Sequence, residues 1–138
     1  MGEPEIERLL TETGIGVLSL ARDGVPYGIP LSFGYDGENR LFFLFAGHSE
    51  EGRKMAFAES SDAGSLLVFE VQSEGAWRSA IAEGPFERIT PDEWHTAREA
   101  LANNAYRPDL LTDVDVTHDP RVWALEIERL TGRAMGKA

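Results

Sequence analysis

IGVLSLARDGVPYGIPLSFGYDGENRLFFLFA, residues 15–46, contains three β segments separated by two turns. The segments are rich in branched and aromatic side chains and cover residues 15–21, 26–35 and 40–46. The turns read RDG and DGEN, and glycine, aspartate and asparagine are the residues that hairpin turns favour. Because proline cannot donate a ladder hydrogen bond, Pro26 and Pro30 place the middle segment at an edge or a bulge.

The rest of the chain adds short helices and further strands around these three segments. Thr90-Pro91-Asp92-Glu93 predicts a helix start, with a threonine N-cap, proline in the first position and glutamate in the third. The other expected helices cover residues 3–12 and 50–59, and the other expected strands cover residues 65–71, 77–89 and 122–130. Six strands with regularly spaced turns predict a mainly β domain, a small barrel with helical caps over residues 1–138.

The composition excludes several classes of site. The chain has no cysteine, so disulfides, thiolate metal sites and cysteine nucleophiles are ruled out. Twenty-four acidic residues give a net charge of -11, which argues against nucleic acid as a partner. We find neither a secretory leader nor an apolar run long enough for a membrane span, so we expect a cytoplasmic protein. The acidic surface and scarcity of lysine also lead to the hypothesis of a halophilic source, which full folding at low salt would oppose.

Arg53 and Lys54 are the candidate anion site. The chain has only two lysines, and this one directly follows an arginine near the expected start of a helix, for which Ser49 is the predicted N-cap. A helix N-terminus offers free N–H groups and positive potential, to which the two cations add charge-assisted bonds. The alternative is that the cations form salt links with Glu50 and Glu51. The local sequence favours neither reading, and the scarcity of lysine elsewhere tips the balance toward binding.

Other polar groups carry weaker hypotheses. The set Asp113, Asp115, His118 and Asp119 has no calcium-loop pattern, so we expect a solvated acidic loop and no metal site. Trp77 and Ser79 open a strand; they are either core and incidental, or a wall and a polar contact for a ligand in a neighbouring subunit. His48 lies next to the candidate site and is the only candidate catalytic residue, with a structural hydrogen bond as the alternative.

The order of these features resembles the pyridoxamine-5'-phosphate-oxidase-like family of FMN-binding split barrels. The motifs that carry the resemblance are VPYGIPLSF at 25–33, LFFLFA at 41–46, GRK at 52–54, SLLVFE at 65–70 and WRSAIAEGPFERI at 77–89. Each motif is weak alone, and their order and spacing make the match. The resemblance implies a homodimer of split barrels that holds two FMN molecules in clefts between its subunits.

The resemblance also implies particular contacts. Arg53 and Lys54 would hold the FMN phosphate, and Trp77 and Ser79 would reach the flavin from the partner subunit. The full set of implied cofactor-binding residues is Ile29, Pro30, Leu31, Ser32, Phe45, Ala46, Gly47, His48, Ser49, Arg53, Lys54, Trp77 and Ser79.

The end of the chain departs from true pyridoxamine phosphate oxidases. Residues 130–136 contain a single arginine and no histidine, whereas those enzymes carry substrate-binding arginine and histidine residues there. The chain is more similar to the nitroimidazole-resistance-type branch, which implies NAD(P)H-linked reduction of a small molecule such as a nitro compound or a quinone. The alternatives are a flavin-holding protein without turnover, for storage or sensing, and a relative that binds deazaflavin or haem in the same cleft.

Overall fold

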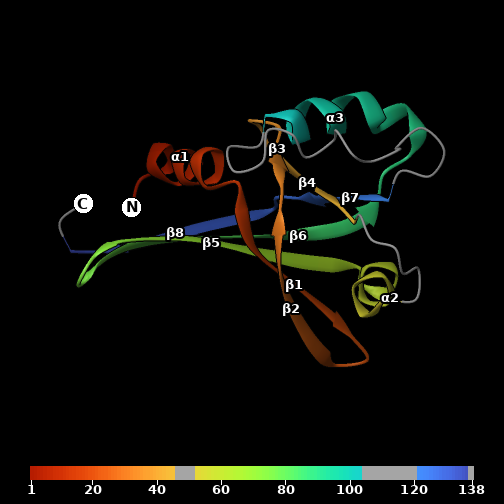
Figure 1. Ribbon diagram of the computed structural model, residues 1–138, viewed down its shortest axis with the longest axis horizontal. Coiled ribbons are helices and arrows are strands. Elements are labelled where there is room, and N and C mark those ends of the chain that lie inside the picture. Colours follow the sequence, from red (N-terminus) through yellow and green to blue (C-terminus); the bar gives the residue numbers. More distant parts are fainter. Residues whose placement is uncertain (46–51, 104–120, 137–138) are drawn as a thin grey trace.

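The computed structural model describes residues 1–45, 52–103 and 121–136 (Figure 1). The helices are α1 (Glu3–Thr13), α2 (Arg53–Ser60) and α3 (Trp94–Ala102), and a 3-10 turn, η1 (Pro91–Glu93), leads into α3. The strands are β1 (Ile15–Arg22), β2 (Val25–Ser32), β3 (Gly34–Tyr35), β4 (Arg40–Leu44), β5 (Ala63–Ser73), β6 (Ala76–Arg88), β7 (Val122–Glu126) and β8 (Arg129–Met135).

All strand pairs are antiparallel and belong to one curled sheet. The order is β2-β1-β5-β6-β7-β4-β3, and β8 pairs with β6. The mainly β class is therefore confirmed, and the sheet forms the half barrel of a split-barrel fold (Figure 1). The predicted number of six strands is wrong, because the described residues contain eight.

The hairpin between β1 and β2 forms as the sequence predicts. Asp23 and Gly24 at its tip have φ values of 51° and 79°, the left-handed conformation that tight hairpin turns need. β2 lies at the edge of the sheet, where Pro26 and Pro30 are tolerated. The strand predicted over residues 26–35 is nevertheless two strands, since β2 pairs with β1 whereas β3 pairs with β4.

β6 is the longest strand, and its pairing explains why one strand was predicted over residues 122–130 where the structure has two. Residues 77–83 of β6 pair with β8, and residues 86–88 pair with β7. At Gly84 between these regions, a Cβ atom would lie 1.6 Å from the carbonyl oxygen of Glu126, so a residue with a side chain does not fit. The predicted strand over residues 122–130 therefore divides at this crossing into β7 and β8.

α1 and α2 pack on one face of the curled sheet, whereas α3 packs on the opposite face of β4 and β7, and the helices enclose two apolar clusters. In the larger cluster, α1 buries Ile6, Leu9 and Leu10, and Gly14 ends the helix at a φ of 70°. In the smaller, α3 packs on β4 and β7, and Gly34 allows a close approach, because a Cβ there would be 2.5 Å from backbone atoms of α3. Among the described helices, none has the length and apolar character to cross a bilayer.

Two helix starts differ in how well the sequence predicts them. The start of η1 and α3 is confirmed: the backbone N–H of Thr90 donates to Oε1 of Glu93 at 3.1 Å, as a capping box requires. The predicted start of α2 is wrong, because the helix begins at Arg53 instead of residue 50. Gly52 precedes it in an extended conformation, and glycine disfavours a helix interior.

Candidate functional site

The candidate anion site is the first turn of α2. Gly52 is the N-cap, with φ -63° and ψ 150°, and no side chain caps the helix. Arg53 and Lys54 are the first two helical residues, so their backbone N–H groups belong to the unpaired set at a helix start. The predicted N-cap, Ser49, lies outside the described residues. The structure thus puts both predicted cations directly at a helix N-terminus.

This first turn carries two cations and no acid. The helix dipole places positive potential at the N-terminus, so each cation there is unfavourable by about 0.3–1 kcal/mol when no anion is present. Neither Arg53 nor Lys54 forms an ion pair within the described residues. The alternative partners, Glu50 and Glu51, lie outside those residues. With a bound anion, both the helix dipole and the two cationic side chains would interact favourably with its negative charge.

Arg53 also contacts two aromatic rings. Its Cζ atom lies 5.2 Å from the ring centroid of Tyr27 on β2 and 5.5 Å from that of Phe57 on α2. The two rings stack on each other with centroids 4.7 Å apart. Neither Tyr27 nor Phe57 was predicted to belong to the site. Phe57 follows Arg53 by four residues, which is a sequence signal for a shared helix face, whereas Tyr27 meets them only through the fold.

The β2 residues of the predicted site alternate between the two faces of the sheet. Ile29 and Leu31 face the core and pack against its larger cluster, whereas Pro30 lies opposite Val17 and is exposed. Ser32, at the end of β2, is half-buried. The strand therefore presents its backbone and its two prolines to solvent at the sheet edge, where a ligand has access to them.

Phe45 follows β4 and is 3% exposed. Its ring packs on Trp123 at a centroid distance of 4.9 Å, and its N–H donates to the carbonyl of Arg121 at 2.8 Å. In this chain the residue therefore packs in the core. The next predicted site residues, Ala46, Gly47, His48 and Ser49, lie outside the described part of the structure.

Trp77 and Ser79 lie on the sheet face opposite α1 and α2, which we call the outer face. Trp77 pairs with Val71 and Met135, and Ser79 pairs with Phe69 on β5. Cross-strand partners share a face, so these side chains form one surface. Within a single chain, Val71 is 70% exposed, Met135 59% and Phe69 56%.

The two halves of the predicted site are far apart in one chain. α2 ends directly before the start of β5, whereas Trp77 pairs with Val71 near the other end of that strand. Eight residues of extended chain span roughly 25 Å. Figure 1 shows the same separation, with α2 at one end of β5 and the β5–β6 hairpin at the other. Within one chain, the two predicted groups therefore lie at opposite ends of β5.

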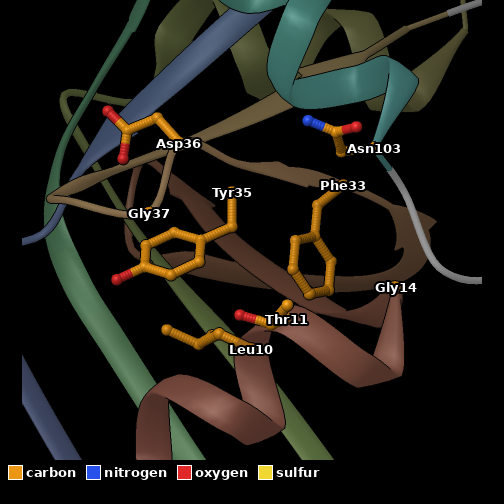
Figure 2. Close-up of a pocket in the computed structure, with 8 residues that line it drawn as sticks. All are labelled: Leu10, Thr11, Gly14, Phe33, Tyr35, Asp36, Gly37 and Asn103. Carbon is orange, nitrogen blue, oxygen red and sulfur yellow. The ribbon is translucent and has the colours of Figure 1, made fainter.

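The described residues also enclose a hollow of about 320 Å³ away from α2. Figure 2 shows the rings of Phe33 and Tyr35 over α1, with Asn103 of the α3 end above them. Its full lining is Leu10, Thr11, Gly14, Phe33, Tyr35, Asp36, Gly37 and Asn103. Neither candidate cation lines this hollow, and no sequence pattern predicted it.

The polar groups of the hollow are engaged within the protein. The hydroxyl of Tyr35 donates to Oε1 of Glu7 at 3.3 Å, and burial together with the charge of Glu7 raises the pKa of Tyr35 to about 12. Oδ1 of Asp36 accepts the backbone N–H of Glu38 at 2.8 Å and two more from the same turn. These contacts hold α1 and the β3–β4 turn in place.

No group of three or more potential metal ligands occurs within residues 1–45, 52–103 and 121–136. The acidic set of Asp113, Asp115, His118 and Asp119 lies outside these ranges. His95 is exposed on α3, with Nε2 3.4 Å from the carboxylate of Glu99.

Comparison with known proteins places this geometry in a family. The family model described as pyridoxamine 5'-phosphate oxidase matches residues 2–134. An FAD-binding protein of Mesorhizobium loti superposes with a TM-score of 0.78 at 20% identity, covering 99% of this chain and 96% of that one. A proposed 5-nitroimidazole antibiotic resistance protein of Bacteroides thetaiotaomicron has a TM-score of 0.71 at 20% identity, covering 98% and 85%.

Two further proteins extend the comparison. An FAD- and haem-binding protein of Mycobacterium smegmatis has a TM-score of 0.72 at 20% identity, covering 99% of this chain and 72% of that one. A curated relative, an uncharacterized protein of Rhizobium meliloti (strain 1021), is 26% identical over 89 residues. That match covers 64% of this chain and 56% of the relative, so the chain spans only about half of that protein's length. Since the family model covers nearly the whole chain and the curled sheet has the split-barrel form, the chain belongs to the pyridoxamine 5'-phosphate oxidase family.

Proposed function

We propose that the protein binds FMN, with the flavin phosphate at the start of α2, and uses it as an oxidoreductase. The observation that carries the proposal is the pair Arg53 and Lys54 in a first turn without an acid, neither of them ion-paired within the described residues. A phosphomonoester would accept charge-assisted bonds from both side chains and from free backbone N–H groups. When bound, a flavin supplies hydride and electron transfer, and the protein supplies binding and orientation.

The choice of flavin has support from two directions. Solved structures of similar fold include proteins that bind FAD, so a flavin suits the fold. A clamp of two cations at one helix start suits the terminal phosphate of FMN. The haem-binding protein of similar fold is the reason to keep haem as a competing ligand, and deazaflavin stays an alternative as well. Absorbance of the purified protein from the near ultraviolet to the blue separates these cofactors.

A homodimer completes the proposed site. The outer face exposes Phe69, Val71 and Met135 beside the half-buried Trp77, and exposed apolar patches of this kind mark interfaces. A second copy covering this face would bring its Trp77 and Ser79 to the cofactor held at α2 of the first copy. This arrangement accounts for the separation of the two groups along β5 in one chain.

The proposed reaction is NAD(P)H-linked reduction of a small molecule such as a nitro compound or a quinone. We propose His48 as the residue that hydrogen-bonds the ring or the substrate; it lies outside the described residues. The test is to reduce the loaded protein with NAD(P)H without oxygen and then to add the candidate acceptors. Faster reoxidation of the flavin with an acceptor supports the oxidoreductase. Flavin that stays reduced supports storage or sensing without turnover, and colourless protein that binds no FMN contradicts the whole proposal.

A further inference from the structure

The guanidinium of Arg53 is held by a rigid pair of rings. Phe57 is 6% exposed, and Tyr27 is half-buried and packs against the larger core cluster. The rings stack at an interplanar angle of 20°, with Arg53 within 5.5 Å of both centroids. An arginine against an aromatic ring gains cation–π attraction while its N–H edge stays available for a bidentate contact with phosphate.

We propose that Tyr27 is a positioning residue of the anion site: its ring, stacked on Phe57, fixes the guanidinium of Arg53 for contact with the phosphate. This inference rests on the proposed function. An exposed arginine otherwise samples many rotamers, and binding would have to order it. The ring pair orders the side chain before the ligand arrives, so β2 contributes to cofactor affinity without touching the phosphate itself.

The role requires the ring of Tyr27 and not its hydroxyl. In the part of the chain that the structure describes, the hydroxyl forms no hydrogen bond. Phenylalanine would therefore serve equally well, and leucine would fill similar core space without a ring. Lys54 provides an internal contrast, because within the described residues it has no cation–π contact.

Calorimetric titration of Tyr27→Leu and Tyr27→Phe with FMN and with riboflavin, which lacks the phosphate, tests the inference. We expect Tyr27→Leu to bind FMN about three- to tenfold more weakly and riboflavin unchanged, with Tyr27→Phe like wild type. In an Arg53→Gln background, Tyr27→Leu should have no further effect on FMN. Equal losses for both flavins, or a Tyr27→Phe variant as weak as Tyr27→Leu, would overturn the positioning role.

A second readout needs no flavin. The NMR signal of the Arg53 side-chain N–H, assigned by its loss in Arg53→Gln, should show a ring-current shift in wild type and Tyr27→Phe that is smaller in Tyr27→Leu, where only the Phe57 ring remains beside the guanidinium. An unchanged signal in Tyr27→Leu would overturn the inference. Wild-type protein that binds FMN no more tightly than riboflavin would instead overturn the phosphate site itself, and the inference with it, even if the ring-current shift is present.

Discussion

Arg53 and Lys54 place two positive charges where a helix gains least from them. The first turn of α2 has neither an acidic residue nor a side-chain cap, whereas α1 carries Glu3 and Glu5 in its own first turn. Residues that oppose the local preference of a helix are typical of functional sites. At the scale of single residues, the proposed anion site is therefore marked by a local conflict that a bound phosphate would resolve.

Replacing Lys54 with alanine should separate binding from stability. We expect FMN affinity to fall by about 1.5–3 kcal/mol, the scale of a hydrogen bond to a charged group. The cofactor-free variant should be as stable as wild type or more so, because the substitution removes a cation from the helix N-terminus. Titration with FMN and thermal unfolding of the apo protein measure the two effects.

Lys137→Ala, which changes the only other lysine, is the matched control and should leave FMN affinity unaltered. If Lys54→Ala bound FMN as tightly as wild type, the two-cation clamp would be wrong. An apo protein that unfolds at a much lower temperature would show instead that Lys54 serves the fold.

At the scale of elements, the sequence predicted those turns and helix ends that short-range contacts determine. The turn at Asp23 and Gly24, the end of α1 at Gly14 and the cap of α3 were all predictable, because each depends on neighbouring residues. The division of residues 122–135 into two strands was not, since it depends on Gly84 in a distant strand. The contact of Tyr27 with Arg53 could not be predicted from the sequence for the same reason, because it forms only when the fold brings β2 beside α2.

Glu93 gives the start of α3 a measurable pH dependence. The backbone N–H of Thr90, followed by the guanidinium of Arg40, holds the pKa of Glu93 below its ordinary value of 4.5. A lowered folded-state pKa contributes stability above about pH 4.5, and that contribution is lost as the pH falls through the folded value. Ordinary carboxyl groups titrate between about pH 5 and pH 3. Over this range we therefore expect the free energy of unfolding to fall more for wild type than for Glu93→Gln.

Urea unfolding at several pH values measures this difference. Glu99→Gln is the control, because Glu99 lies on the exposed side of α3 and, within the described residues, its carboxyl is paired with His95 alone. Parallel stability curves for wild type and Glu93→Gln over the acid range would show that the capping box does not contribute in the way described.

At the scale of the whole molecule, the proposed dimer would form through the outer face. If a second copy covers it, Val71→Lys would bury a charge in an apolar interface and should give a monomer. Val25→Lys is the control, because Val25 is also exposed, at 47%, but lies at the tip of the β1–β2 hairpin. Sedimentation equilibrium measures both variants. A wild-type monomer, or a Val71→Lys protein that stays dimeric, would contradict this interface.

The central claim is that the start of α2 binds the flavin phosphate. Calorimetric titration of the wild-type protein with FMN and with riboflavin, at the same low ionic strength, tests it most directly. Because two charge-assisted contacts act only on the phosphate, we expect FMN to bind at least about tenfold more tightly than riboflavin. Equal affinity for the two flavins, or no binding of either, would contradict it.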